Sequence, residues 1–282
     1  MGNTIDWGQA AVNNTIGFGD GAENNTIGWG DIQADSWSPE TNLTGTGGTP
    51  AFTNTLSTLF DGVDDSVAMG NVLNVADDGT DRMSISFWTN TTSSTYIQRI
   101  VGKCLSNGYG YSVYKYSGTH LYFLLGEYAT NYIRGTYNFS SLSDGNYHHI
   151  VWTYDGSRSA TGMNLYIDGV QMSISTSSVG TVIGLVTSAE FMLGAGYKSS
   201  SPLHPYNGIL DEVSIFNTEL SASDVTTIYN SGTPNNISAL SPLGYWRMGD
   251  GSTYPTINDE IGSNDGTMTN MSSANFVTDV PT

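Results

Sequence analysis

Three aspartates of the segment FDGVDD, namely Asp61, Asp64 and Asp65, have the residue type and spacing of a calcium site. Ca²⁺ takes six to eight oxygen ligands, and a turn dense in carboxylates and main-chain carbonyls supplies them. The alternative is a turn in which these side chains accept hydrogen bonds from their own backbone. The sequence leaves both interpretations open, and Ca²⁺ is the one cofactor that it favours.

Asp211 is a fourth metal candidate, because it interrupts the apolar strand pattern ILDEVSIF. Regular alternation places Asp211 on the face of Val213 and Ile215, and Glu212 on the opposite face. We therefore expect one of the two carboxylates to be partly buried. A buried carboxylate must be ion-paired, hydrogen-bonded or bound to a metal, and a hydrogen-bonded structural role is the alternative to a metal ligand.

Aromatic side chains in two loops rich in Gly and Ser, SNGYGYSVY and GAGYKSSSPLHPYNG, are suited to stack on sugar rings. The candidates for carbohydrate binding are Tyr109, Tyr111, Tyr197, His204 and Tyr206. The alternative is ordinary packing, since Tyr is common on sheet edges. The adjacent pair His148 and His149 is predicted to be structural, because neighbouring residues on a strand point to opposite faces and do not share one metal ion.

The composition indicates a turn-rich all-β protein with an acidic surface. Eight Lys and Arg face 26 Asp and Glu in 282 residues, for a net charge of −18, and 34 residues are Gly. Nucleic-acid binding is not expected, because phosphate neutralisation needs many basic side chains. No apolar run is long enough for a membrane span, so membrane insertion is not expected either, and the N-terminus lacks the pattern of a signal peptide.

Residues 1–31 contain three copies of an eleven-residue unit that begins Asn-Thr-Ile. Each copy carries Ile and then an aromatic residue two positions later, as a short strand with one apolar face does. These residues are Ile5, Trp7, Ile16, Phe18, Ile27 and Trp29. Such short units do not bury their own apolar faces, so we expect an attachment or oligomerisation module; the alternative is a small layer folded onto the main domain. Residues 32–50 have the composition of a linker.

From residue 51 onward, short strand patterns follow one another. Met83, Ile85 and Phe87 alternate with serines, and Ile150, Trp152 and Tyr154 share one face. Asp168-Gly169 predicts a type I′ hairpin. One helix of about ten residues is predicted to begin at Ser221, whose spacing to Asp224 is that of a capping box, and to end near Asn230.

Five of these segments, FDGVDDSVAMG, MSISFW, DGNYHHIVWTYDG, LYIDGVQ and GILDEVSIFNTELSASDVTTIYN, resemble in order the strand motifs of laminin-G-like domains in the concanavalin A-like superfamily. The resemblance implies an all-β, two-sheet antiparallel jelly-roll sandwich over residues 51–282, with rim loops that in relatives bind sugars, often with calcium. The segment GYWRMGDGSTYPTINDEIGSNDGTMTNM looks like the strand and loop that usually open such a domain. We expect residues 243–282 to complete the sandwich; a truncated second copy is the alternative.

Glucanases share this architecture and use paired carboxylates in an E-x-D-x-E pattern, which this sequence lacks. An enzyme is therefore not expected. The repeated N-terminus and the C-terminal segment also resemble virion proteins of tailed bacteriophages, especially marine ones. This second resemblance implies a virion location, other virion proteins and host surface glycans as partners, and a homo-oligomer, by analogy a trimer. The competing hypothesis is a secreted or cell-surface calcium-dependent bacterial lectin.

Overall fold

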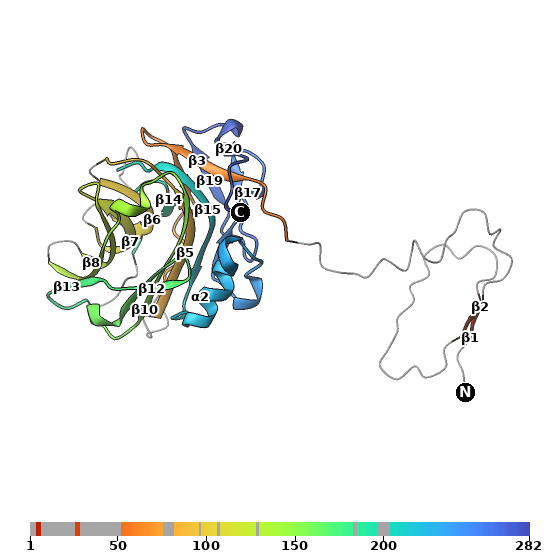
Figure 1. Cartoon of the computed structure of the whole chain (residues 1–282), viewed down its shortest axis with the longest axis horizontal. Coiled ribbons are helices and arrows are strands. Elements are labelled where there is room, and N and C mark those ends of the chain that lie inside the picture. The colour runs from red at the N-terminus through yellow and green to blue at the C-terminus, as the bar shows by residue number, and fades with distance from the viewer. Residues whose placement is uncertain are drawn as a thin grey trace. The chain divides into compact units, whose positions relative to one another are not determined.

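The structure is a computed structural model of the chain. It describes residues 4–6, 26–28, 52–75, 82–95, 97–105, 108–127, 130–182, 185, 187–196 and 204–282. The chain divides into two compact units, Met1–Ala51 and Phe52–Thr282. Figure 1 shows the strands of the second unit, coloured along the chain from orange to blue.

In the first unit, β1 (Thr4–Asp6) pairs with β2 (Thr26–Gly28) in parallel. The register sets Ile5 opposite Ile27, which hold the same position in the first and third eleven-residue repeats. Equivalent residues of repeated units therefore lie side by side along the backbone, as expected for stacked repeats. The other predicted attachment residues, Trp7, Ile16, Phe18 and Trp29, lie outside the described residues.

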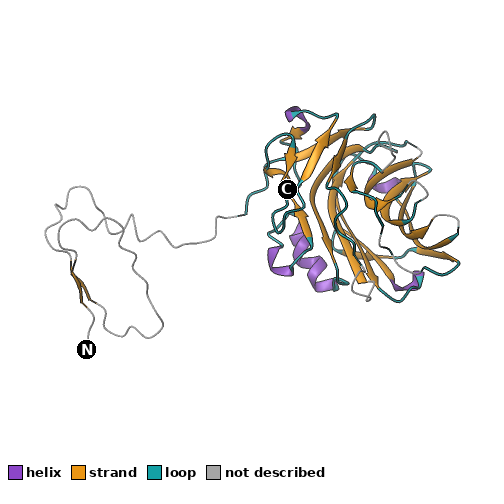
Figure 2. Ribbon diagram, turned by 180° about the vertical axis from the view of Figure 1, so that it is seen from behind, coloured by secondary structure: helices purple, strands orange, loops and turns teal. Residues whose placement is uncertain are grey.

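The second unit is a sandwich of two antiparallel sheets, as predicted (Figure 2). The eight-stranded sheet has the order β12 (Val170–Met172), β11 (Met163–Ile167), β10 (Tyr147–Asp155), β5 (Arg82–Asn90), β15 (Asn207–Phe216), β3 (Ser57–Asp61) and β20 (Phe276–Val277), with β16 (Gly244–Trp246) also paired to β15.

The nine-stranded sheet has the order β13 (Ser175–Val179), β9 (Asn131–Asn138), β8 (His120–Glu127), β7 (Gly110–Tyr116), β6 (Ile97–Cys104), β14 (Phe191–Leu193), β4 (Ser66–Ala68), β19 (Gly266–Thr269) and β18 (Thr256–Ile257). The remaining strand is β17 (Met248–Gly251), and single 3-10 turns occupy Ser140–Leu142, Ala160–Gly162, Asn230–Gly232, Ser238–Leu240 and Ser273–Asn275.

The main core lies between the two sheets and is built by strand alternation. Met83, Ile85 and Phe87 of β5 point into it, as predicted from their spacing, and so do Ile150, Trp152 and Tyr154 of β10. The sheets approach closely at Gly135 of β9, where an added Cβ would lie 2.5 Å from the ring of Trp152. Any side chain at position 135 would therefore push the two sheets apart.

Local turn and cap signals also behave as the sequence predicts. The hairpin between β11 and β12 turns at Asp168 and Gly169, which have φ of 50° and 77°, the positive values that a type I′ turn requires. Helix α2 (Ala222–Tyr229) begins after a capping box formed by Ser221 and Asp224. The helix ends at Asn230, which adopts the left-handed conformation.

A second, smaller apolar cluster covers the outer face of the eight-stranded sheet. Val225 and Ile228 of α2 pack there with Val151 of β10 and Tyr245 of β16. This sheet is therefore covered on both faces at its centre, by the nine-stranded sheet on one side and by α2 with its flanking segments on the other (Figure 1).

The C-terminal segment contributes strands to both sheets. β16 pairs with β15 and β20 with β3 in one sheet, while β18 and β19 extend the other through β4. Tyr245, Trp246 and Met248 are all buried, and the ring of Trp246 stacks on Phe191 at 5.3 Å between centroids. Within the described part of the chain, no helix has the length and apolar character to cross a membrane.

Candidate functional site

The outer face of the nine-stranded sheet carries a cluster of tyrosine and arginine side chains at its centre. We call it the tyrosine–arginine face and define it by six residues: Arg99, Tyr114, Tyr116, Tyr122, Tyr132 and Arg134. They come from four neighbouring strands, β6 to β9. Strand alternation places them there, because the intervening residues Val113, Leu121, Phe123 and Ile133 fill the main core.

The rings of this face touch one another in a continuous array. Tyr122 lies at its centre, 5.2 Å from the stacked ring of Tyr116 and 5.3 Å from Tyr114, which it meets edge-on. His120 flanks the same ring at 6.3 Å. Such contacts fix the rings with little remaining rotational freedom, so the array forms a rigid aromatic surface.

Each arginine lies over a tyrosine ring. The guanidinium carbon of Arg134 is 4.4 Å from the ring centroid of Tyr122, and that of Arg99 is 5.3 Å from Tyr114. Arg99 Nη1 also donates to Ser112 Oγ and lies within 3.1 Å of Cys104 Sγ. These contacts hold both cations against the tyrosine rings, on which guanidinium groups stack favourably.

Neither arginine forms an ion pair with a carboxylate among the described residues. The buried Nε atoms of Arg99 and Arg134 also have no hydrogen-bond partner there. Among the residues of β6 to β9 that share this face, none is Asp or Glu, although the chain carries 26 acidic residues against eight basic ones. The face is therefore a cationic area in a strongly acidic protein, and its charge favours an anionic ligand.

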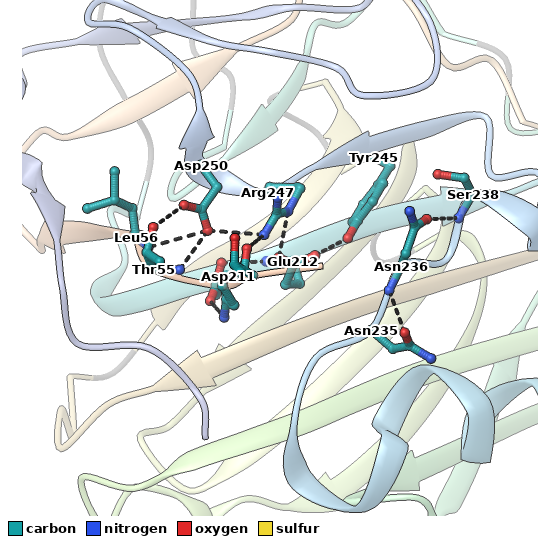
Figure 3. A network of polar contacts seen from close by, with 12 residues as sticks. Thr55, Leu56, Asp211, Glu212, Asn235, Asn236, Ser238, Tyr245, Arg247 and Asp250 are labelled. Atoms are coloured by element: carbon teal, nitrogen blue, oxygen red, sulfur yellow. Dashed lines mark hydrogen bonds and ion pairs between the residues drawn. The ribbon is translucent and has the colours of Figure 1, made fainter. Parts of the chain in front are cut away.

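A second polar cluster is buried where β15 meets the two ends of the domain (Figure 3). Arg247 Nε donates to Glu212 Oε1 at 3.1 Å, and its Nη2 pairs with Asp250 at 3.1 Å. The Tyr245 hydroxyl donates to the other Glu212 oxygen, and Asp250 accepts from the Thr55 backbone amide at 2.8 Å. This buried carboxylate network joins the start of the domain to its C-terminal segment.

The structure corrects the regular alternation of side chains that was predicted for ILDEVSIF. A β-bulge interrupts the pairing of β15 with β5 between Asp211 and Ser214, and Glu212 has a φ of 47°. Leu210 consequently joins Val213 in the main core, and both carboxylates are buried instead of one. Burial raises the pKa of both groups, that of Glu212 to about 7.

A family model described as the concanavalin A-like lectin/glucanase superfamily, of the laminin-G type, matches residues 61–226. The match spans more than half of the chain and overlaps all five segments that resemble laminin-G-like domains. The chain belongs to this superfamily. The resemblance inferred from the strand motifs is thereby confirmed. No curated protein sequence matches the chain significantly.

Solved structures of this superfamily fold resemble the domain at low sequence identity. A candidate carbohydrate-binding protein from Bacteroides ovatus has a TM-score of 0.58 and 15% identity, over 82% of this chain and 62% of that chain. This chain thus spans less than two thirds of the length of that protein. The CBM40 of the Ruminococcus gnavus IT-sialidase, bound to α2,3-sialyllactose, has a TM-score of 0.43 and 12% identity, over 63% of this chain and 100% of the module. A pentraxin of Limulus polyphemus has a TM-score of 0.39 and 12% identity, over 76% and 95%.

The structure separates the five residues predicted to bind carbohydrate. Tyr111 and Tyr206 are fully buried in the main core, where the Tyr111 hydroxyl donates to the Leu73 carbonyl, so the prediction that these rings stack on sugars is wrong. Tyr109 is half-buried in the turn between β6 and β7. Tyr197 lies outside the described residues.

Among the predicted sugar-binding residues that the structure describes, His204 borders the tyrosine–arginine face. Its carbonyl accepts from the Arg99 backbone amide at 2.8 Å. Burial, and then the charge of Arg99, lower the pKa of the His204 ring, so the ring is neutral at pH 7. The tyrosines of the face itself follow a Tyr-x-Tyr alternation in YSVYKY, a signal that identifies a strand but not the face exposed to ligand.

Asp61, Asp64 and Asp65 do gather, with one oxygen of each within 4.8 Å of the others. Asp61 Oδ1 accepts from the Val63 amide at 2.7 Å, which is the turn bonding expected under the structural alternative. Asp65 is buried, and burial first, then the charges of Asp61 and Asp64, raise its pKa. Ca²⁺ binds oxygen ligands, and the oxygens of these three carboxylates, which repel one another, are ligands of that kind.

Asp211 does not belong to this group of aspartates. Its carboxylate accepts from Asn54 Nδ2 at 2.8 Å and from the Glu212 amide at 2.9 Å, the hydrogen-bonded role that was the alternative to a metal ligand. His148 and His149 also have separate structural partners. His148 Nδ1 contacts Asp168 at 2.8 Å, and His149 is fully buried with Nε2 against Ser86 Oγ.

Proposed function

We propose that the protein is a non-enzymatic structural component of a tailed-bacteriophage virion that displays a glycan-binding sandwich. In this proposal the N-terminal repeats attach the protein to other virion proteins. The sandwich then presents the tyrosine–arginine face to glycans of the host surface. The family description, which names lectins beside glucanases, and the absence of an E-x-D-x-E pattern support binding over hydrolysis.

The tyrosine–arginine face is the observation that carries glycan binding. Aromatic rings stack on the apolar C–H faces of sugars, and half-exposed Tyr116, Tyr122 and Tyr132 provide such rings. The guanidinium groups of Arg99 and Arg134 add paired donors with no carboxylate partner in the described part of the chain. Guanidinium forks bind carboxylate and sulfate groups through two parallel hydrogen bonds. Glycans with an acidic group are therefore the expected ligands.

The binding proposal is tested by titrating the full chain with sialylated and sulfated oligosaccharides in a calorimeter. The double variant Arg99→Gln/Arg134→Gln should weaken binding about a hundredfold or more, because each of the two lost charge-assisted hydrogen bonds contributes about 1.5–3 kcal/mol. Arg82→Gln is the matched control, since Arg82 is exposed at the start of β5 and its loss changes the net charge by the same amount per site. Equal affinity of the double variant and the wild type would contradict the proposal.

The attachment proposal is supported by the repeats and by the in-register pairing of Ile5 with Ile27. Several weak contacts made together raise the strength of attachment, which favours a homo-oligomer, and by analogy with phage appendages we propose a trimer. Deletion of residues 1–31 should leave the sandwich folded and remove the protein from purified particles, as read by immunogold labelling. Normal labelling of particles assembled with the deleted protein would refute the attachment role.

The Asp61, Asp64 and Asp65 group favours a second candidate function, a secreted or cell-surface calcium-dependent bacterial lectin. Under this alternative, addition of Ca²⁺ raises the melting temperature and the glycan affinity of the wild type, and Asp64→Asn removes both effects. The virion proposal requires neither effect. Glycan affinity that is unchanged by a chelator therefore argues against the calcium-dependent lectin.

A further inference from the structure

A pocket of about 550 Å³ opens on the outer face of the eight-stranded sheet. Trp88 of β5 and Asp168 of the β11–β12 turn line it, together with Tyr229 at the end of α2. Asn90, Asn146 and the C-terminal residues 279–282 complete the wall. Trp88 lies on the face of β5 opposite the core residue Phe87, whereas the tyrosine–arginine face lies outside the other sheet. The two areas are therefore on opposite sides of the sandwich.

The aromatic part of this pocket is rigid. The ring of Tyr229 stacks on Trp88 at 5.7 Å and on His149 at 6.0 Å between centroids. Trp88 is 2% exposed and His149 is fully buried, so both support the ring of Tyr229, which remains half-exposed. A ligand entering the pocket meets a fixed aromatic ring at no cost in side-chain ordering.

The indole Nε1 of Trp88 is buried and has no hydrogen-bond partner among the described residues. An unpaired buried donor destabilises the free protein, so a ligand oxygen that accepts from it gains binding free energy. On the opposite side, Asp168 is held in place by the His149 backbone amide at 2.9 Å and by His148 Nδ1 at 2.8 Å. The pocket thus combines a fixed acceptor and an aromatic ring with a buried, unpaired donor in its wall.

We propose that this pocket binds a neutral sugar residue. Sugar hydroxyl groups both donate and accept, so a single ring can accept from Trp88 Nε1 and donate to Asp168. The apolar C–H face of the sugar then packs on Tyr229. An ammonium ligand has no acceptor for the indole N–H, and an acidic sugar is repelled by Asp168 and Asp279, which both line the pocket. The pocket therefore complements the tyrosine–arginine face, which favours acidic groups.

The test is a titration of the ¹⁵N-labelled full chain with glucose, galactose, mannose, N-acetylglucosamine and lactose, followed by the tryptophan indole N–H resonances. Trp88→Phe identifies the resonance of Trp88 by its disappearance. We expect at least one of these sugars to shift this resonance saturably. Tyr229→Ala should weaken that binding about tenfold, and the control Tyr229→Phe should preserve it because the ring remains.

Two outcomes would overturn the inference. The first is that none of the five sugars shifts the Trp88 resonance, and the second is that Tyr229→Ala binds as tightly as Tyr229→Phe. The double variant Arg99→Gln/Arg134→Gln distinguishes the two sites, because it should leave the neutral-sugar titration unchanged. Loss of the Trp88 shift in that arginine variant would show that neutral sugars bind at the tyrosine–arginine face, which would also refute the separate pocket site.

Discussion

The outer faces of the two sheets differ in both cover and charge. The outer face of the nine-stranded sheet is partly exposed at β6 to β9, where Arg99 and Arg134 have no carboxylate partner among the described residues. The face of the eight-stranded sheet is covered by α2 and by the C-terminal segment, and its buried or half-buried charges include Asp168, Asp211 and Glu212. In both sheets, every second side chain along a strand points into the shared core.

This comparison shows how one core supports two different surfaces. The inner residues of both sheets are apolar and set the fold, so the outer positions are free to vary. On the open sheet they form a rigid aromatic and cationic area. On the covered sheet they bind the two ends of the domain together through the buried carboxylate network. Experiments that remove the cover or change a buried charge test whether the two faces are independent.

The largest loss of stability is expected when the segments that cover the eight-stranded sheet are removed. Truncation after Asn236 deletes β16 and the later strands, which exposes Val151 and Phe216 and removes the buried rings of Tyr245 and Trp246. Burial of such rings stabilises the fold by several kcal/mol at roughly 25 cal/mol per Å², comparable to the whole stability of a domain. We expect aggregation, measured by size-exclusion chromatography. A soluble product with a cooperative thermal transition would show that the cover is dispensable.

A smaller change in stability is expected when a charge of the buried carboxylate network is altered. Burial raises the pKa of Glu212 from 4.5 to about 7, so between these values the folded state binds more protons than the unfolded state. Stability from this group is fully present below pH 4.5 and is lost as the pH rises through 7, by about 3 kcal/mol in all. Glu212→Gln should reduce this decline, as measured by urea unfolding at several pH values.

Two features make the Glu212 experiment selective. Burial lowers the pKa of His149 to about 3, which gives a pH dependence of opposite sign between pH 3 and 6.5. The difference between variant and wild type at each pH, and not the slope of the wild type alone, therefore isolates Glu212. Glu219→Gln is the control, since Glu219 is exposed. Parallel stability curves for wild type and Glu212→Gln would disprove the linkage.

The smallest effect is expected at the helix cap on the covered face. Ser221 accepts from the Asp224 amide, and the Asp224 carboxylate accepts from the Ser221 amide at 2.9 Å. Ser221→Ala should cost about 1 kcal/mol, measured as a lower midpoint of urea unfolding. Glycan affinity at the open face should not change, because α2 packs only on the other sheet. A loss of affinity in this variant would show that the two faces are coupled.

Local features of the sequence were sufficient for several elements of the secondary structure. The alternation at Met83, Ile85 and Phe87 predicted a strand with its buried face, and Asp168-Gly169 predicted the hairpin turn that the structure contains. Ser221 and Asp224 predicted the start of the helix. These features are local, because turn dihedrals, caps and strand phase depend on residues within a few positions of one another.

The sequence by itself determined the strand periodicity, the turns, the helix cap and the superfamily. Only the tertiary structure decided which tyrosines are exposed: Tyr111 is in the core, whereas Tyr116, five residues later on the same strand, is partly exposed on the outer face. It also decided that a bulge buries both Asp211 and Glu212. The physical reason is that periodicity defines two faces of a strand, while the pairing of segments distant in sequence selects which of them becomes the core.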